Sequence, residues 1–246
     1  MAARRAISFP AGMAGNVLRG ALGHVLREED YSRVFRPVAT AKGPSGLADS
    51  PRPFVIRASE LDDRTVAAGE QFCFGLNWFD TGERLDPVVQ AFGHWADLIS
   101  VEHSAVSIEL TPRNAAARIR VEFQTPTDLR TDDSGLGVLL ARARDRLSTL
   151  RALYGAGPLD IDFRGLAERA REVKTVRSDL RRVAIERRSS RTGQRHGIGG
   201  FTGFAEYEGD LGEFVPYLEA AHWTGVGRHC TWGNGQISTT ILNSGL

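Results

Sequence analysis

Hydrophobic and polar positions alternate along the chain with two periods, and each change of period marks a new element. Over 15–27 (GNVLRGALGHVLR) apolar residues recur at helical spacing, which predicts a helix with one apolar stripe. Over 71–79 (QFCFGLNWF) every second residue is aromatic or aliphatic, which predicts a strand. Phe72, Phe74, Leu76 and Trp78 alternate onto one face of this strand. The remaining predictions are strands over 4–9, 53–59 and 103–110, a loop over 36–53 and a helix over 85–99.

The resulting order, β-α-β-β-α-β, then repeats. The run AARIRVEF (116–123) alternates cleanly and predicts a strand. Its inward residues are predicted to be Ala117, Ile119, Val121 and Phe123, and its outward residues Arg118, Arg120 and Glu122. The other predicted elements are helices over 134–153, 163–172 and 214–221 and strands over 173–188, 199–209 and 236–242.

Two such units in tandem predict the α+β class, built from two ferredoxin-like (RRM-like) βαββαβ folds. Each unit places four antiparallel strands on one side and helices on the other. The boundary is predicted near 111–115, which gives domains of residues 1–112 and 113–246. The second domain carries an arginine-rich helical insertion and a glycine-rich loop near its C-terminus.

Composition adds few restrictions. The 246 residues are 41% hydrophobic and 25% charged, as in ordinary soluble domains. Cys73 lies within an apolar run, which predicts a buried core residue. With no Cys-x-x-Cys or His-x-x-x-His spacing, we expect neither a structural metal nor a cofactor. The chain shows no long apolar run and no signal-peptide pattern, so we expect a cytoplasmic protein with no membrane partner.

Charge is distributed unevenly, although the net charge is only +1. Residues 141–200 hold fifteen Arg or Lys against seven Asp or Glu, a local net charge of +8. All basic residues are arginines except Lys42 and Lys174. A compositional bias explains the scarcity of lysine but not the clustering. Because guanidinium groups bind phosphate through two parallel hydrogen bonds, the cluster predicts a polyanion or an acidic protein as partner.

The segment 224–237, TGVGRHCTWGNGQI, contains two G-x-G motifs. Their glycines, Gly225, Gly227, Gly233 and Gly235, enclose Arg228 and His229. A dinucleotide site or P-loop requires a strand before and a helix after the glycines, and here a β-prone run follows without a GK[ST] motif. Two explanations remain. The glycines form tight turns that need positive φ, or they form a backbone cradle whose N–H groups face the phosphates of an RNA strand.

Several segments together resemble the RAMP-superfamily endoribonucleases that process CRISPR precursor RNA, the Cas-six family. TGVGRHCTWGNGQI is similar to the family's C-terminal glycine-rich loop, with Asn234 in place of the last apolar residue. GGFTGFAEYEGDLGEFVPYLEAA is similar to the strand and helix before that loop, and RRSSRTGQRHGIGG to the basic approach to that strand. NVLRGALGHVLR is similar to the N-terminal helix, and PFVIRA followed by an apolar strand also fits. The arginine-rich middle also fits the variant found in type IV CRISPR systems.

The resemblance implies a metal-independent endoribonuclease that cleaves CRISPR repeat RNA to mature crRNA and often retains the product. The 2′-OH attacks the adjacent phosphate and leaves a 2′,3′-cyclic phosphate and a 5′-OH. Such chemistry needs a base, an acid and a cation, and histidine and arginine suit these roles. The implied partners are the stem-loop of the repeat RNA or crRNA and other Cas effector subunits.

His24 is the first catalytic candidate, because it lies at the margin of the apolar stripe of 15–27 and the resemblance places a frequent catalytic histidine there. Arg27 and Tyr31 are nearby candidates, and His229 in the glycine-rich segment is the second histidine. For both histidines the alternative is a hydrogen-bonded structural role. The predicted RNA-binding residues are Arg19, Arg181, Arg182, Arg187, Arg188, Arg191, Arg195, Gly225, Gly227, Arg228, Gly233 and Gly235.

Two other functions remain open from the sequence. One is a non-catalytic RAMP subunit that holds guide RNA in an effector complex, which repeat cleavage in EDTA would distinguish. The other is a ferredoxin-like module for a small molecule or a protein, which copurifying RNA would argue against.

Overall fold

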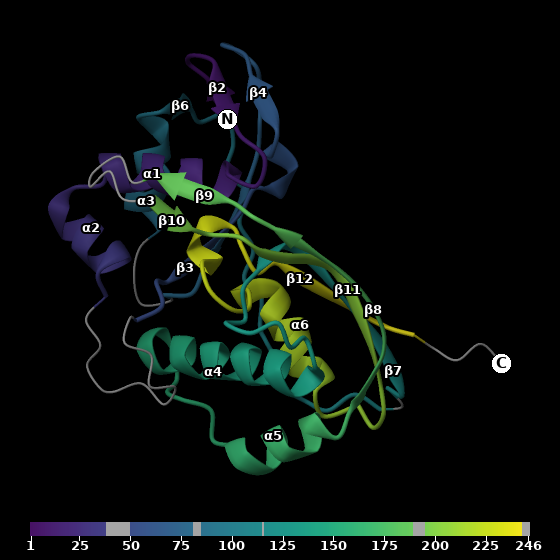
Figure 1. The fold of residues 1–246 in the computed structure, drawn as a ribbon. Coiled ribbons are helices and arrows are strands. Elements are labelled where there is room, and N and C mark those ends of the chain that lie inside the picture. The colour runs from purple at the N-terminus through teal and green to yellow at the C-terminus, as the bar shows by residue number, and fades with distance from the viewer. Residues whose placement is uncertain (38–49, 81–84, 115, 189–194, 243–246) are drawn as a thin grey trace. The chain divides into compact units, whose positions relative to one another are not determined.

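The computed structural model describes residues 1–37, 50–80, 85–114, 116–188 and 195–242, and the chain forms two compact units (Figure 1). The N-terminal unit consists of Met1–Ser107, Ser148–Pro158 and Thr231–Gly233. The C-terminal unit consists of Ile108–Leu147, Leu159–Cys230 and Asn234–Leu246. No helix in the described part of the chain is long and apolar enough to cross a membrane.

The N-terminal unit pairs its strands in antiparallel twos. The pairs are β1 (Ala2–Ala3) with β6 (Ala96–Asp97), β2 (Ile7–Phe9) with β4 (Arg64–Val66), and β3 (Phe54–Arg57) with β5 (Gly75–Trp78). Its helices are α1 (Ala14–Val25), α2 (Glu28–Phe35), α3 (Asp86–Gly93) and the short 3-10 turn η1 (Ser59–Leu61).

Helix α1 forms where the 3.6-residue spacing predicts it, and Leu18 and Leu22 are fully buried. Its first amide, that of Ala14, donates to Oδ1 of Asp62 at 2.8 Å, which satisfies one of the unpaired N–H groups at a helix start. Burial raises the pKa of Asp62 above its ordinary value, although the amides of Ala14 and Met13 partly offset that rise.

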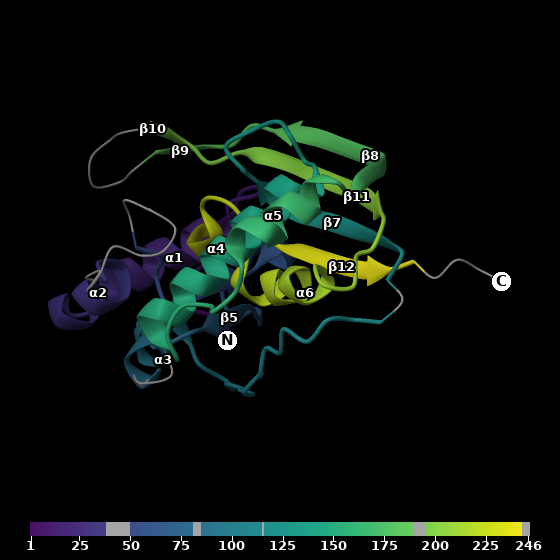
Figure 2. The ribbon, with the colours of Figure 1, turned by 90° about the horizontal axis from the view of Figure 1, so that it is seen from below.

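The C-terminal unit contains a four-stranded antiparallel sheet in the order β12-β7-β11-β8. These strands are β7 (Arg118–Thr127), β8 (Lys174–Val183), β11 (Gly200–Glu208) and β12 (Ile237–Ile241). The other elements are α4 (Leu136–Tyr154), α5 (Phe163–Arg171), α6 (Val215–Thr224), η2 (Cys230–Trp232) and a hairpin of β9 (Glu186–Arg188) and β10 (Arg195–Gly197). Helices α4, α5 and α6 lie along one side of the sheet (Figure 2). This is the ferredoxin-like arrangement, so the predicted fold class is confirmed.

The core of the C-terminal unit follows from period-two alternation in β7. Ile119, Val121 and Phe123 are at most 2% exposed and pack beneath the helices, as predicted. Tyr207 on β11 is fully buried, and its hydroxyl donates to the carbonyl of Ser134 at 2.5 Å. Burial raises the pKa of Tyr207 far above its ordinary value, so the hydroxyl stays protonated.

Three sequence predictions are wrong. Cys73 is exposed, because Phe72 occupies the core side and the next side chain points the other way. Ala117 is exposed while Ala116 is buried, because the regular strand begins only at Arg118.

The predicted strand over 103–110 is the third. Residues 98–112 form neither strand nor helix, and Val106 and Ile108 are exposed. A strand forms only where a neighbouring strand can pair with it, and none of the described strands pairs with this segment. The strand β1 pairs instead with β6, at Ala96–Asp97. The predicted loop over 36–53 falls mostly outside the described residues.

Candidate nucleic-acid interface

His24 lies in the last turn of α1 and is exposed. Leu18 and Leu22 on the same helix face the core, so the margin of the apolar stripe is where the sequence predicted it. Gly23, beside His24, packs on α2: a Cβ there would lie 3.5 Å from the ring of Tyr31. The fold therefore brings the end of α1 and the predicted tyrosine together.

Tyr31 belongs to a stack of aromatic and cationic side chains on α2. Its ring lies parallel to that of Phe35, with centroids 4.9 Å apart, and the guanidinium of Arg36 lies 5.1 Å from the Tyr31 ring centroid. Arg27 is exposed immediately before the helix. The two residues predicted from the sequence, Arg27 and Tyr31, thus lie at the start of α2 and within it. The sequence did not identify Phe35 as part of this cluster.

Arg19 is held between two aromatic rings in the N-terminal unit. Its Cζ lies 4.9 Å from the ring centroid of Phe35 and 5.2 Å from that of Trp232. A Cβ on Gly15 would meet the backbone of Trp232 and Gly233, so glycine is required for this approach. The close packing gives Arg19 a structural role, and its contact with RNA stays a prediction.

The four glycines of the segment 224–237 all have positive φ: 72° at Gly225, 79° at Gly227, 88° at Gly233 and 70° at Gly235. A Cβ would collide with the carbonyl oxygen of Asp128 at Gly227 and with that of Val226 at Gly235. The explanation by tight turns is therefore correct for this segment.

The second explanation, a cradle of N–H groups for phosphate, is wrong for four amides of the segment. The amides of Gly225, Val226, Arg228 and Gly235 donate to the carbonyls of Ala221, Gly235, Asp128 and Pro126 at 2.8–3.1 Å. These donors bind the segment to α6 and to the end of β7, so they are not available to a ligand.

The side chains between the glycines are more accessible. Arg228 is exposed and forms an ion pair with Asp128 at 3.3 Å. His229 is partly exposed and has φ +64°, a conformation uncommon for residues other than glycine. Strained backbone of this kind concentrates at functional sites, which keeps His229 a candidate.

The basic approach to β11 forms the β9–β10 hairpin, which we call the arginine hairpin. Arg187 lies opposite His196, and Arg188 lies opposite Arg195. Arg195 is exposed and pairs with Glu186 at 3.4 Å. The predicted residue Arg191 lies outside the described residues.

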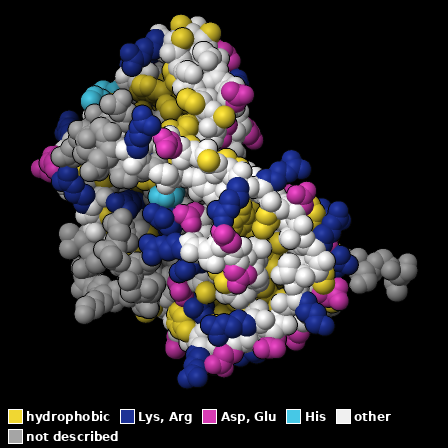
Figure 3. All heavy atoms as spheres, in the orientation of Figure 1, with side chains coloured by type: hydrophobic (Ala, Val, Ile, Leu, Met, Phe, Trp, Pro, Cys, Tyr) yellow, Lys and Arg dark blue, Asp and Glu magenta, His cyan; other side chains and the backbone are white. Residues whose placement is uncertain are grey.

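On β8, next to the arginine hairpin, Arg181 pairs with Asp179 at 3.7 Å and Arg182 pairs with Asp132. All four side chains are more than half exposed. Basic and acidic groups are likewise interspersed over the surface seen in Figure 3. Exposed ion pairs contribute little stability, so these arginines can exchange a carboxylate for a phosphate at small cost.

Sequence reasoning missed the loop after β7. A polar cavity of about 440 Å³ there is lined by Thr127, Asp128, Arg130, Thr131, Asp132, Arg182, Gly199, Gly200 and Phe201. Arg130 has φ +63°, and its amide donates to Oδ1 of Asp128 at 2.8 Å. Asp128 also forms the ion pair with Arg228, and the neighbouring Thr127 pairs with Phe201 at the start of β11. The loop therefore contacts both the glycine-rich segment and β11. The only signal in the sequence is the polar run DLRTDDS, which is typical of any loop.

The fold defines a class: a tandem ferredoxin-like protein. Residues 121–237 match the family model described as CRISPR-associated endoribonuclease Cas6, and residues 1–98 match a model described as an N-terminal domain. The C-terminal part of the chain, residues 121–237, therefore carries a Cas6-family domain. No curated protein matches the chain in sequence.

Solved structures agree over nearly the whole chain. A product complex of Cas6 (TTHB231) covers 96% of this chain and 97% of its own, with a TM-score of 0.59 and 16% identity. The structure of Thermus thermophilus Cas6 (TTHB231) covers 94% of this chain and 91% of its own, with a TM-score of 0.56 and 17% identity. A product complex of Cas6 (TTHA0078) covers 93% of each chain, with a TM-score of 0.57 and 16% identity. At these identities the likeness establishes the fold.

Proposed function

We propose that this protein cleaves CRISPR repeat RNA to mature crRNA by metal-independent attack of a 2′-OH, and that it retains the product. One observation carries the proposal. The residues that match the Cas6 family model, 121–237, are those that hold the arginine hairpin and the glycine-rich segment. Structures of similar fold include product complexes of Cas6.

The proposed reaction needs two proton transfers. A base takes the proton of the 2′-OH, the 2′-oxygen bonds to phosphorus, and the bond from phosphorus to the 5′-oxygen breaks as an acid protonates that oxygen. The products are a 2′,3′-cyclic phosphate and a 5′-OH. A histidine performs either transfer near neutral pH, and a guanidinium stabilises the charge that develops on phosphorus.

His24 is the proposed proton-transfer residue, because it is exposed at the end of a helix whose other face is anchored in the core. Arg27 and Tyr31 supply a cation and a hydroxyl on the adjoining helix. His229 is the second candidate, since its partly exposed, strained position lies between glycines that the fold requires.

The arginine hairpin is the proposed contact for the repeat stem. A-form RNA is recognised largely through its phosphates and its shape, and a two-stranded ribbon with Arg187 and Arg195 presents cations along its length. Neutralising phosphates releases counterions, so stem binding should weaken steeply with salt.

Incubating the protein with its cognate repeat RNA in EDTA tests the proposal. We expect a single cut, a 5′ fragment that ends in a 2′,3′-cyclic phosphate, a 3′ fragment that begins with a 5′-OH, and no cut when the nucleotide before the cleavage site is 2′-deoxy. The deoxy substrate serves as the matched control, because it should bind as tightly as the ribose form. Tight binding without any cut would instead favour a subunit that only holds guide RNA.

A further inference from the structure

The sheet of the C-terminal unit has a second face, opposite its helices. On β11, Ala205 and Tyr207 are fully buried toward the helices, so Phe204 and Glu206 lie on the other face. Neither residue belongs to the arginine hairpin or to the glycine-rich segment. We call this surface the open face.

Phe204 is half-buried on a central strand of this face, and two guanidinium groups lie over its ring. The Cζ of Arg120 lies 4.3 Å from the ring centroid and that of Arg177 lies 5.3 Å from it. These arginines come from the two strands that flank β11, so three neighbouring strands build the cluster.

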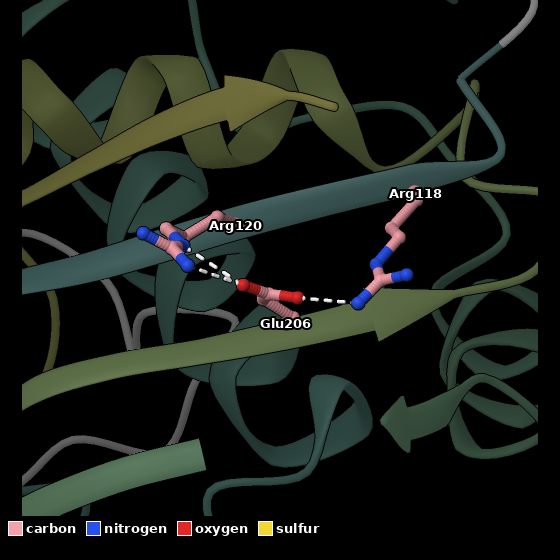
Figure 4. A network of polar contacts seen from close by, with 3 residues as sticks. All are labelled: Arg118, Arg120 and Glu206. Atoms are coloured by element: carbon pink, nitrogen blue, oxygen red, sulfur yellow. Dashed lines mark hydrogen bonds and ion pairs between the residues drawn. The ribbon is translucent and has the colours of Figure 1, made fainter. Parts of the chain in front are cut away.

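A buried carboxylate positions one of these guanidiniums. Oε1 of Glu206 accepts hydrogen bonds from Arg120 Nε at 3.0 Å and Nη2 at 2.5 Å, and Oε2 accepts one from Arg118 Nη2 at 2.6 Å (Figure 4). The Glu206 side chain is 3% exposed, whereas Arg118 is 41% and Arg120 31% exposed. The carboxylate thus holds two partly exposed guanidinium planes before any ligand binds.

The sequence of β11 explains why one aromatic residue stands on this face. Residues 200–207, GFTGFAEY, follow the aromatic pattern of the RNP1 strand of RRM domains with one residue inserted. Side chains alternate between the two faces of a strand, so the insertion places these two aromatic positions three residues apart and on opposite faces. Phe201 accordingly packs in the core on Phe123, and Phe204 stays outside.

We propose that the open face binds single-stranded RNA, with one base stacked against the Phe204 and Arg120 cluster. Four-stranded sheets of this topology stack unpaired bases on aromatic side chains, and guanidinium planes stack on bases as well. The inference rests on the proposed function for the nature of the ligand, and it adds a site for RNA outside the stem.

Charge on this face distinguishes it from the arginine hairpin. The basic side chains are Arg118, Arg120, Lys174, Arg177 and Arg181, and the acidic ones are Glu122, Asp179, Glu206 and Glu208. Because the acidic groups nearly offset the basic ones, stacking carries the binding, and salt should affect it less than it affects the stem.

Binding of a fluorescently labelled, stemless oligouridylate, measured by anisotropy, tests the site. We expect Phe204→Leu to weaken binding about tenfold, because it keeps apolar volume and loses the stacking ring. Phe204→Tyr is the matched control and should stay within about twofold of wild type. Unchanged oligouridylate binding by Phe204→Leu would overturn the proposal and leave the face to a protein partner.

Two further readouts separate this proposal from the proposed function. Cleavage of an isolated repeat stem-loop should proceed at the wild-type rate in both variants, which also shows that they fold. Photo-crosslinking with 4-thiouridine should label Phe204 within the tryptic peptide of residues 196–228. A crosslink confined to other peptides would overturn the open-face site. If wild type cuts no repeat yet Phe204→Leu loses oligouridylate binding, only the proposed cleavage fails.

Discussion

Glycines in this protein are required for different reasons, and the difference can be measured. Gly235 has φ +70°, and a Cβ there would collide with the carbonyl oxygen of Val226. Gly235→Ala should therefore lower the free energy of unfolding by about 2 kcal/mol, measured by urea denaturation. Gly20 is exposed inside α1 with open space around it, so Gly20→Ala should raise stability by about 0.7 kcal/mol. Equal stability of the two variants would contradict the assigned strain.

His24→Ala tests the proton-transfer role at the same scale. We expect single-turnover cleavage to slow by roughly tenfold or more while RNA affinity stays within a fewfold, because the side chain acts in the reaction and not in binding. His94→Ala is the control, since His94 is also exposed at a helix end of the N-terminal unit. A wild-type rate for His24→Ala would move the role to His229 or an arginine.

At the scale of elements, the Arg118–Glu206–Arg120 network joins β7 to β11 and makes their pairing sensitive to acid. Hydrogen bonds from Arg120 and then Arg118 lower the pKa of Glu206 below its ordinary 4.5. Because the pKa of Glu206 is lower in the folded state, its ionised carboxylate stabilises the fold fully at pH values above the unfolded-state pKa. That stabilisation is lost as the pH falls through the folded-state pKa.

Glu206→Gln should therefore destabilise the protein at about pH 7, and the effect should shrink as the pH falls through the lowered folded-state pKa of Glu206, where the carboxyl itself becomes protonated. Urea denaturation of both proteins over a descending series of pH values measures the difference. Glu208→Gln, two residues along the same strand and exposed, controls for loss of charge alone. A destabilisation that does not change with pH would show that the network is not responsible.

At the scale of the whole molecule, the net charge of +1 conceals a basic region that should govern RNA binding. Replacing Arg188 and Arg191 with alanine should weaken repeat binding and reduce the slope of log affinity against log salt by about one for each phosphate that is no longer neutralised. Arg164 on α5 is highly exposed and lies outside the arginine hairpin, so Arg164→Ala is the control. An unaltered slope in the double variant would exclude the hairpin as the main site of phosphate binding.

Predictions from the sequence succeeded where a local pattern decides the structure. The spacing of Leu18 and Leu22 predicted α1, and the alternation in 116–123 predicted the buried side of β7. Long-range pairing could not be predicted in this way, and the strand expected over 103–110 does not form.

The candidate interface shows the same division. Sequence reasoning named the arginines and the glycine-rich segment, which stand out in composition. Arg130 and Asp128 were missed, because their proximity to the segment arises from contacts about one hundred residues apart in the chain.

The sequence alone determined the order of the main elements of the C-terminal unit, the α+β class and the resemblance to the Cas-six family, because periodicity and local motifs are properties of neighbouring residues. The tertiary structure decided how the glycine amides are used and which side chains share the open face. It did so because hydrogen-bond partners and sheet faces depend on strand register. The pairing of β11 with β7 and β8, for example, brings Arg120 and Arg177 over the ring of Phe204.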